Sequence, residues 1–200
     1  MRPISIQELV GNTDIYLIDQ IMKNRYLPGD KILDAGCGNG RNLPWFIKNE
    51  MEIYGIDKDA SAINYLKEIF QEFKKDRFQA AEISALPFEN NSFDHIISSA
   101  VLHFAKSYSE FNDMMEEMVR VLKPYGSLFI RMTSDIGIEN KVTPIKNGVY
   151  LIPDGSTRFL LTPTLLYSML KENNLSFIEP LKTVNVDNVR CMSTLVLMKK

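Results

Sequence analysis

The sequence has few of the residues that build disulfide frameworks or metal sites. Of its 200 residues, two are cysteine and two are histidine. Cys37 and Cys191 lie far apart, and neither has a neighbour at the spacing of metal ligands, so we expect no metal site. Two isolated cysteines are typical of a protein from a reducing compartment, which predicts a cytoplasmic location.

An excess of positive charge is also missing. The chain has 23 Lys and Arg against 25 Asp and Glu, a net charge of −2. Proteins that bind nucleic acid usually have a basic surplus, so we expect no nucleic-acid partner. No apolar run approaches the ~18 residues of a membrane span, and the first residues lack the apolar core of a signal peptide, so no membrane insertion is expected.

The composition is otherwise ordinary for a folded domain, with 45% hydrophobic and 24% charged residues. A length of 200 residues, with no repeat and no linker, predicts a single domain over residues 1–200. Within it we expect an N-terminal helical segment at 1–30. Residues 133–161 are the least regular stretch, and long irregular segments of compact domains are often lids or substrate-binding loops. Within that stretch, the turn signal at Pro153–Gly155 favours a hairpin.

Apolar strand patterns alternate with amphipathic helix patterns along most of the chain. Strands are expected at 31–36, 52–57, 77–83, 92–99 and 127–132, and helices at 14–25, 41–49, after Asp59, from Ser107 to Pro124 and after Thr162. Segments 176–186 and 190–199 flank a short turn and predict a C-terminal antiparallel hairpin. The sequence therefore predicts an α/β fold of the doubly wound, Rossmann-like type. Its mainly parallel, seven-stranded sheet would have helices on both faces.

The stretch "KILDAGCGNGRN" at 31–42 places a glycine loop directly after the first strand. A dinucleotide fingerprint needs glycine at 41 or 43, where Arg41 and Leu43 stand, and the P-loop pattern fails as well. Asp34 adds negative charge where a phosphate would bind, so a positively charged ligand such as S-adenosylmethionine is favoured. Asp57 ends the second strand, where an acidic side chain can accept hydrogen bonds from ribose hydroxyls.

Four stretches carry a resemblance to a known family: "ILDAGCGNGRN", "IYGIDKDASAI", "AEISALPFENNSFDHIISSAVLHF" and "VLKPYGSLFIR". In order and spacing they resemble the successive motifs of class I S-adenosylmethionine-dependent methyltransferases. The pattern is most similar to the small-molecule group that contains the ubiquinone-biosynthesis and tellurite-resistance enzymes. The resemblance covers roughly residues 14–132 and is much weaker beyond 133, where such enzymes diverge according to their substrates.

The resemblance implies a set of cofactor contacts in the loops that follow the first four strands. The implied contacts are Asp34, Gly36, Cys37, Gly38 and Asn39 at the methionine part, Asp57 at the ribose, Lys58, Glu82 and Ile83 at the adenine, and Ser99 at the methionine part. Glu82 stands where relatives usually have aspartate.

Methyl transfer from a sulfonium is an in-line displacement, which needs a general base only if the acceptor must lose a proton. His103 follows the fourth strand, at the sheet edge where ligands of open α/β folds bind, and matches a histidine common in the family. It is the candidate catalytic residue, as a base or a substrate contact; a structural hydrogen bond is the alternative. Arg131, Arg158 and Arg190 are candidates to bind an anionic acceptor, with surface ion pairs as the alternative.

Three functions remain open at this stage. The first is an S-adenosylmethionine-dependent methyltransferase that acts on a small molecule. The second is a methyltransferase of nucleic acid, and the third is a regulatory module that binds S-adenosylmethionine without turnover. The same motifs serve binding and catalysis, so the sequence does not separate the third from the first. The chain is expected to be a monomer or a homodimer.

Overall fold

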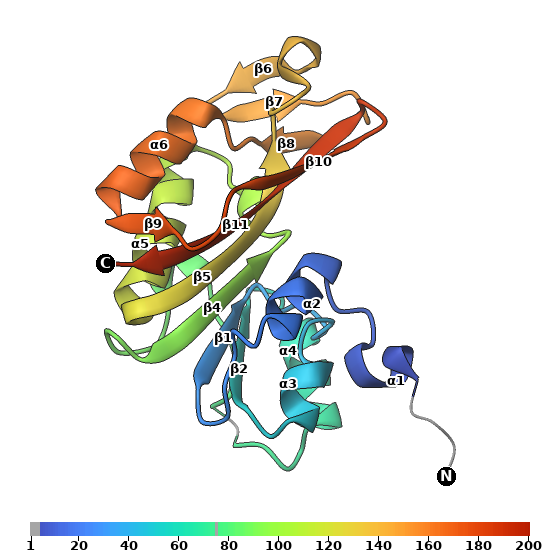
Figure 1. Ribbon diagram of the computed structural model, residues 1–200, viewed down its shortest axis with the longest axis vertical. Coiled ribbons are helices and arrows are strands. Elements are labelled where there is room, and N and C mark those ends of the chain that lie inside the picture. Colours follow the sequence, from blue (N-terminus) through green and yellow to red (C-terminus); the bar gives the residue numbers. More distant parts are fainter. Residues whose placement is uncertain (1–4, 75) are drawn as a thin grey trace.

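The computed structural model describes residues 5–74 and 76–200, and its centre is one large mixed sheet (Figure 1). The strands of this sheet lie in the order β10-β11-β5-β4-β1-β2-β3. The short strand β9 pairs with the last residues of β11, Leu197 to Lys199. Their bounds are Lys31–Ala35 (β1), Glu52–Asp57 (β2), Phe78–Ala80 (β3), Phe93–Ser99 (β4), Leu122–Ser134 (β5), Leu175–Phe177 (β9), Lys182–Val186 (β10) and Arg190–Lys199 (β11).

The direction of the strands follows the expected pattern. β1, β2, β3, β4 and β5 pair in parallel, whereas β11 runs antiparallel to β5, β9 and β10. The doubly wound class and the C-terminal hairpin of β10 and β11 are thus confirmed. The sheet has eight strands rather than seven, because the three-residue β9 also joins it.

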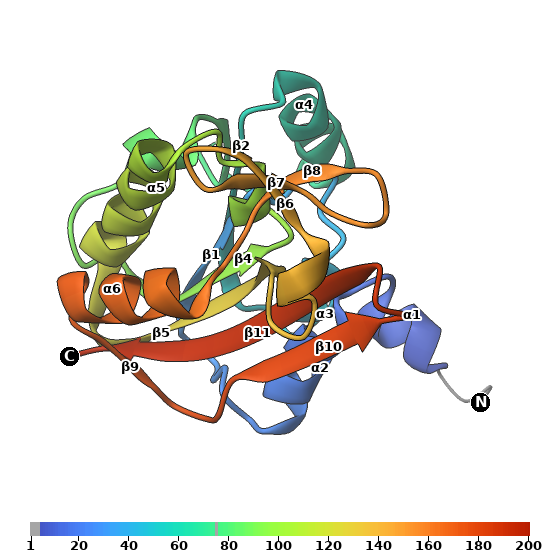
Figure 2. The same cartoon turned by 90° about the horizontal axis from the view of Figure 1, so that it is seen from above.

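Helices cover both faces of the sheet (Figure 2). One face packs against α5 (Tyr108–Val121) and α6 (Pro163–Glu172), and the other against α2 (Ile15–Met22), α3 (Pro44–Lys48) and α4 (Ala60–Ile69). The period of two along each strand divides the core accordingly: Leu33 faces the first layer and Ile32 the second. Burial of apolar side chains on both faces explains why the central strands read as continuous apolar runs.

Several element ends differ from the sequence expectation. The strand expected at 77–83 stops at Ala80, because its partner β2 ends opposite it at Asp57, and Ile83 then begins a short 3-10 helix (η1, Ile83–Ala85). Helix α5 ends at Val121 rather than near Pro124, and β5 begins at once. The helix expected at 14–25 ends at Met22.

Most helix starts were predicted more accurately than the ends; the exception is the helix expected at 41–49, which begins at Pro44. Asp59 caps α4 by accepting a hydrogen bond from the Ser61 backbone N–H. Ser107 caps α5 through the Glu110 backbone N–H, but the Glu110 carboxylate accepts from the Lys106 N–H, so the reciprocal half of the capping box is displaced by one residue.

The irregular stretch 133–161 forms a second, small sheet. Its strands β6 (Thr143–Lys146), β7 (Val149–Leu151) and β8 (Thr157–Phe159) are antiparallel in that order, and a turn over Pro153–Gly155 joins β7 to β8, which confirms the expected hairpin. The small sheet lies at the end of the molecule toward which β5 points (Figure 1). Two further short helices flank it, η2 (Leu102–Phe104) and η3 (Glu139–Lys141).

The described part of the N-terminal segment contains two helices, α1 (Ile6–Val10) and α2, and residues 23–30 form turns and loop. Its first four residues, and thus part of the segment expected at 1–30, lie outside the described residues. None of the described helices is long and apolar enough to cross a membrane.

Candidate active site

The glycine loop after β1 is held close to the end of β2. The backbone N–H groups of Gly36 and Cys37 both donate to the Ile56 carbonyl, at 2.7 and 2.9 Å. Gly36 has φ +89°, and a Cβ there would lie 2.3 Å from a methyl group of Val101. Only glycine satisfies both conditions, so the loop can approach a ligand with its backbone exposed.

Asp57 connects the end of β2 to this loop. Its Oδ2 accepts from the Gly38 N–H at 2.8 Å, and its Oδ1 accepts from the Asp59 N–H at 2.9 Å. Each carboxylate oxygen can accept two hydrogen bonds, so each keeps one free acceptor position. A fixed carboxylate with two free positions is suited to a pair of neighbouring hydroxyl groups.

Two adjoining cavities open at the carboxyl ends of these strands. The smaller one measures about 460 Å³ and is lined by five of the expected cofactor residues, Gly36, Asp57, Lys58, Glu82 and Ile83. The larger one measures about 940 Å³. Gly36 and Ala100 line both cavities and therefore stand where one meets the other. Ala100 has φ +64°, a strained conformation for a residue with a side chain, of the kind that gathers at functional sites.

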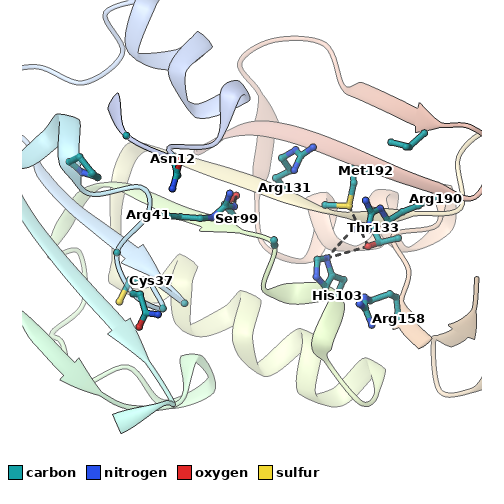
Figure 3. A pocket seen from close by; sticks show the side chains of 18 of the residues that line it. Asn12, Cys37, Arg41, Ser99, His103, Arg131, Thr133, Arg158, Arg190 and Met192 are labelled. Carbon is teal, nitrogen blue, oxygen red and sulfur yellow. Dashed lines mark hydrogen bonds between the residues drawn. The ribbon is translucent and has the colours of Figure 1, made fainter. Parts of the chain in front are cut away.

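The larger cavity brings together most of the other expected residues (Figure 3). The expected residues on its wall are Gly36, Cys37, Gly38, Asn39, Ser99, His103, Arg131, Arg158 and Arg190. Figure 3 shows His103, Arg158 and Arg190 gathered at one end and Arg41 and Ser99 at the other. The three arginines expected to converge do line one space, although they come from β5, β8 and β11.

Asp34 lies behind the loop and lines neither cavity. Its side chain is fully buried, and neither carboxylate oxygen has a hydrogen-bond partner within residues 5–74 and 76–200. Burial raises the pKa of Asp34 to about 7; Arg41 and the nearby Asn42 side chain oppose the rise, and Asp57 adds to it. A buried, unpaired carboxylate is costly, so its surroundings favour either a proton or a positive charge nearby.

A network that sequence reasoning missed closes the other side of the larger cavity. Asp14, the buried N-cap of α2, accepts from Ser99 Oγ at 3.0 Å and pairs with Arg131 at 3.2 Å and Arg41 at 3.5 Å. Arg41 also donates to Ser99 Oγ at 2.9 Å, and the Arg131 guanidinium stacks on the Tyr16 ring. Ser99 therefore lines the cavity as part of a charged network that ties the N-terminal segment to the sheet.

His103 is buried at the wall of the larger cavity. Its Nδ1 accepts from the Thr133 backbone N–H at 3.3 Å. Burial and, after it, the charges of Arg158, Arg190 and Arg131 together lower the pKa of His103 to about 4. The ring is therefore neutral at pH 7, and because Nδ1 accepts a hydrogen bond, the ring proton is on Nε2.

The remaining expected residues differ in the contacts that their side chains make. Arg158 donates to the Thr157 carbonyl and lies over the Phe104 ring, whereas Arg190 is half-exposed and lies 3.7 Å from Asp154. The Cys37 thiol is buried, which raises its pKa, so it is a packing group and not a nucleophile. No group of three or more potential metal ligands occurs among the described residues.

Comparisons with known sequences and with known structures both find similarity to methyltransferases. Residues 33–130 match a family model described as "Methyltransferase domain". An uncharacterized methyltransferase, YodH, of Bacillus subtilis is 34% identical over 113 residues, which are 56% of this chain and 44% of that protein. A tRNA (carboxymethyluridine(34)-5-O)-methyltransferase of Arabidopsis thaliana is 32% identical over 121 residues, 58% of this chain and 28% of that protein.

The chain thus spans less than half the length of these two relatives. A crystal structure of an S-adenosylmethionine-dependent methyltransferase from Methanosarcina mazei superposes with a TM-score of 0.73 at 21% identity. It covers 90% of this chain and 96% of that chain, which shows that the folds agree over nearly the whole length.

Proposed function

This chain belongs, over residues 33–130, to the class I S-adenosylmethionine-dependent methyltransferases, and from this premise we propose that it methylates a small anionic molecule. The observation that carries the proposal is the pair of adjoining cavities. One is lined by Asp57 and Glu82 and the other by arginines, and they meet at Gly36. A nucleoside donor on one side and an anion on the other would meet at that point.

The residues of the smaller cavity fit the adenosine part of S-adenosylmethionine. The two free acceptor positions of Asp57 suit the ribose hydroxyls, as acidic residues after the second strand do in related folds. Glu82 would accept from the adenine amino group, with the Ile83 backbone N–H beside the ring. Lys58 would border the adenine from the exposed side.

The residues at the glycine loop fit the methionine part. Gly36, Cys37, Gly38 and Asn39 would line it, with Asp34 beneath. The unpaired Asp34 carboxylate supports a positively charged ligand here, because a nearby cation would favour its ionised form. Arg41 is the guanidinium nearest in sequence to the loop and is suited to the carboxylate end of methionine.

Methyl transfer requires mainly that the donor and the acceptor are held in the correct relative position. When bound, S-adenosylmethionine supplies an activated methyl group. The chain orients the acceptor, and correct orientation alone can be worth a large part of the acceleration. His103 would contact the acceptor through Nε2–H, since its other nitrogen is taken by Thr133. Arg131, Arg158 and Arg190 would bind the anionic group.

A methyltransferase of RNA is the second candidate, because three relatives carry that activity in their names. The net charge of −2 does not support it, since RNA binding depends on contacts with many phosphates. A regulatory module that binds the cofactor without turnover is the third.

Release of S-adenosylhomocysteine separates the three candidates. The protein is incubated with S-adenosylmethionine and with a small-molecule extract, total tRNA or no acceptor. We expect release with the small-molecule extract alone. Release with tRNA would identify the second candidate, and binding of the cofactor without release in every pool would identify the third.

A further inference from the structure

The polar side chains that face the larger cavity are dominated by hydrogen-bond donors. Four of its residues are arginines, and none of the described residues that line it is Asp, Glu, Lys or Tyr. Asp14 lies behind the wall and pairs with Arg41 and Arg131, so it balances part of their charge. Arg158 and Arg190 both interact with the exposed Asp154, which lies 3.7 Å from Arg190, so two carboxylates face four arginines and the cavity keeps a positive charge.

His103 adds another donor to this wall. The Thr133 N–H holds Nδ1, and burial together with the three neighbouring guanidinium groups keeps the ring neutral, so Nε2 carries the proton. In this arrangement the side chain offers an N–H to the acceptor and is poorly suited to remove a proton from it. The cavity therefore recognises an acceptor that is already ionised.

The common acceptors of methyl groups differ in this respect. An amine is protonated at neutral pH, with a pKa of ~10.4, and its ammonium form is repelled by the arginines. A phenol, with a pKa of ~10, must lose its proton before it becomes a good nucleophile. A carboxylate, with a pKa of ~4, is ionised already, and its two oxygens match the planar fork of a guanidinium group.

We propose that the methylated atom is a carboxylate oxygen and that the product is a methyl ester; this rests on the proposed function. A lone pair of the carboxylate oxygen forms the new bond to the methyl carbon. The bond from that carbon to sulfur breaks, and its electron pair stays on the sulfur. The negative charge of the carboxylate and the positive charge of the sulfonium disappear together, and no proton moves.

This charge balance also explains how product would leave a cavity lined by arginines. The ester is neutral at the methylated group, so its attraction to Arg158 and Arg190 falls on transfer. An acceptor methylated at another atom would keep its anion and its hold on these side chains. Loss of a charge-assisted hydrogen bond weakens binding by ~1.5–3 kcal/mol, or about tenfold or more.

The chemical stability of the product tests the proposal. The protein is incubated with S-adenosylmethionine labelled with tritium in the methyl group and with the acidic small-molecule fraction of a cell extract. The product is then treated with alkali, which hydrolyses carboxylic methyl esters to volatile methanol. We expect most of the transferred label to become volatile.

Label that stays in the acceptor after alkali would overturn the proposal, because such label marks methylation at nitrogen, carbon, sulfur, an ether oxygen or a phosphate. The proposed methyl transfer itself would still stand. If no label is transferred and no S-adenosylhomocysteine forms, the proposed function itself fails. The two failures are thus distinguishable.

Binding provides a readout that does not depend on turnover. Calorimetry in the presence of S-adenosylhomocysteine compares the dicarboxylates from malonate to adipate with their diamides. We expect at least one dicarboxylate to bind about tenfold more tightly than its diamide, a preference that Arg190→Gln reduces. Arg77→Gln removes the same charge outside both cavities and is the matched control. Equal binding of acids and amides, or no binding of any dicarboxylate, would contradict the proposal.

Discussion

The Asp34→Asn substitution is expected to stabilise the folded protein at neutral and alkaline pH and to weaken its preference for a positively charged ligand. Asp34 is fully buried, and neither of its oxygens has a hydrogen-bond partner among the described residues. Burial raises its pKa from 3.8 to about 7. A pKa difference of this size between the folded and unfolded states corresponds to about 4 kcal/mol.

The sign of the effect follows from which state binds the proton more tightly. Because the folded pKa is raised, the Asp34 carboxyl does not oppose folding below pH 3.8, where it is protonated in both states. Between pH 3.8 and about 7 the unfolded chain loses the proton first, so the stability of the wild type falls progressively as pH rises. Asparagine carries no charge at either pH.

Chemical denaturation of the wild type and of Asp34→Asn at pH 4 and pH 8 measures this difference. The two free energies of unfolding should be close at pH 4, and at pH 8 the variant should be more stable by up to ~4 kcal/mol. The new amide also needs partners, which reduces the gain to a value nearer ~2 kcal/mol. A variant that is less stable at pH 8, by an amount that does not change with pH, would refute the reasoning.

The same pair of proteins reports on the ligand. S-adenosylmethionine carries a sulfonium charge that S-adenosylhomocysteine lacks. A nearby negative charge favours the sulfonium form by roughly 1–2 kcal/mol at an effective dielectric constant of ~20, or about tenfold in affinity. The ratio of the two dissociation constants should therefore shift toward S-adenosylhomocysteine in Asp34→Asn, by about tenfold or more. An unchanged ratio would place the positive charge of the ligand away from Asp34.

Two further substitutions probe the loop and the acceptor cavity. Gly36→Ala places a methyl group 2.3 Å from a Val101 methyl, at a backbone φ of +89°, and should weaken cofactor binding in calorimetry by about tenfold or more. Gly29 has a similar φ but nothing within 4 Å of its added Cβ, so the control Gly29→Ala should leave cofactor binding unchanged. His103→Ala should lower kcat more than cofactor affinity, and His103→Gln, which keeps a donor, should recover part of kcat; equal kcat in wild type and His103→Ala would remove this residue from the mechanism. Because the pKa of His103 falls from 6.5 to about 4 on folding, the wild type should lose roughly 3 kcal/mol more stability than His103→Gln between pH 7 and pH 4, and parallel denaturation curves would contradict this.

The parts of the fold that follow from local pattern were predictable from the sequence. The apolar runs at β1 and β4 are buried on both faces, and the caps at Asp59 and Ser107 depend on neighbours three residues away or closer. The position of Asp57 beside the glycine loop follows from parallel strands that end at one edge.

The contacts that were missed join residues far apart in the chain. Asp14 meets Ser99 and Arg131 across 85 and 117 positions, and no local pattern indicates that an N-cap would also receive two guanidinium groups. The single strand expected at 176–186 is divided, because Leu175–Phe177 (β9) pair with one end of β11 and Lys182–Val186 (β10) with the other. The roles of His103 and of the arginines, the small-molecule acceptor, the single-domain organisation and the oligomeric state stay predictions.

The central claim is tested most directly by calorimetric titration with S-adenosylmethionine. Three proteins are compared: the wild type, Asp57→Ala and the exposed control Glu68→Ala. Asp57 would offer two charge-assisted hydrogen bonds to the ribose, so its loss should weaken binding by about tenfold or more. The account predicts one site per chain in the wild type and in Glu68→Ala, with much weaker binding in Asp57→Ala. No binding by the wild type, or equal affinity in all three proteins, would contradict it.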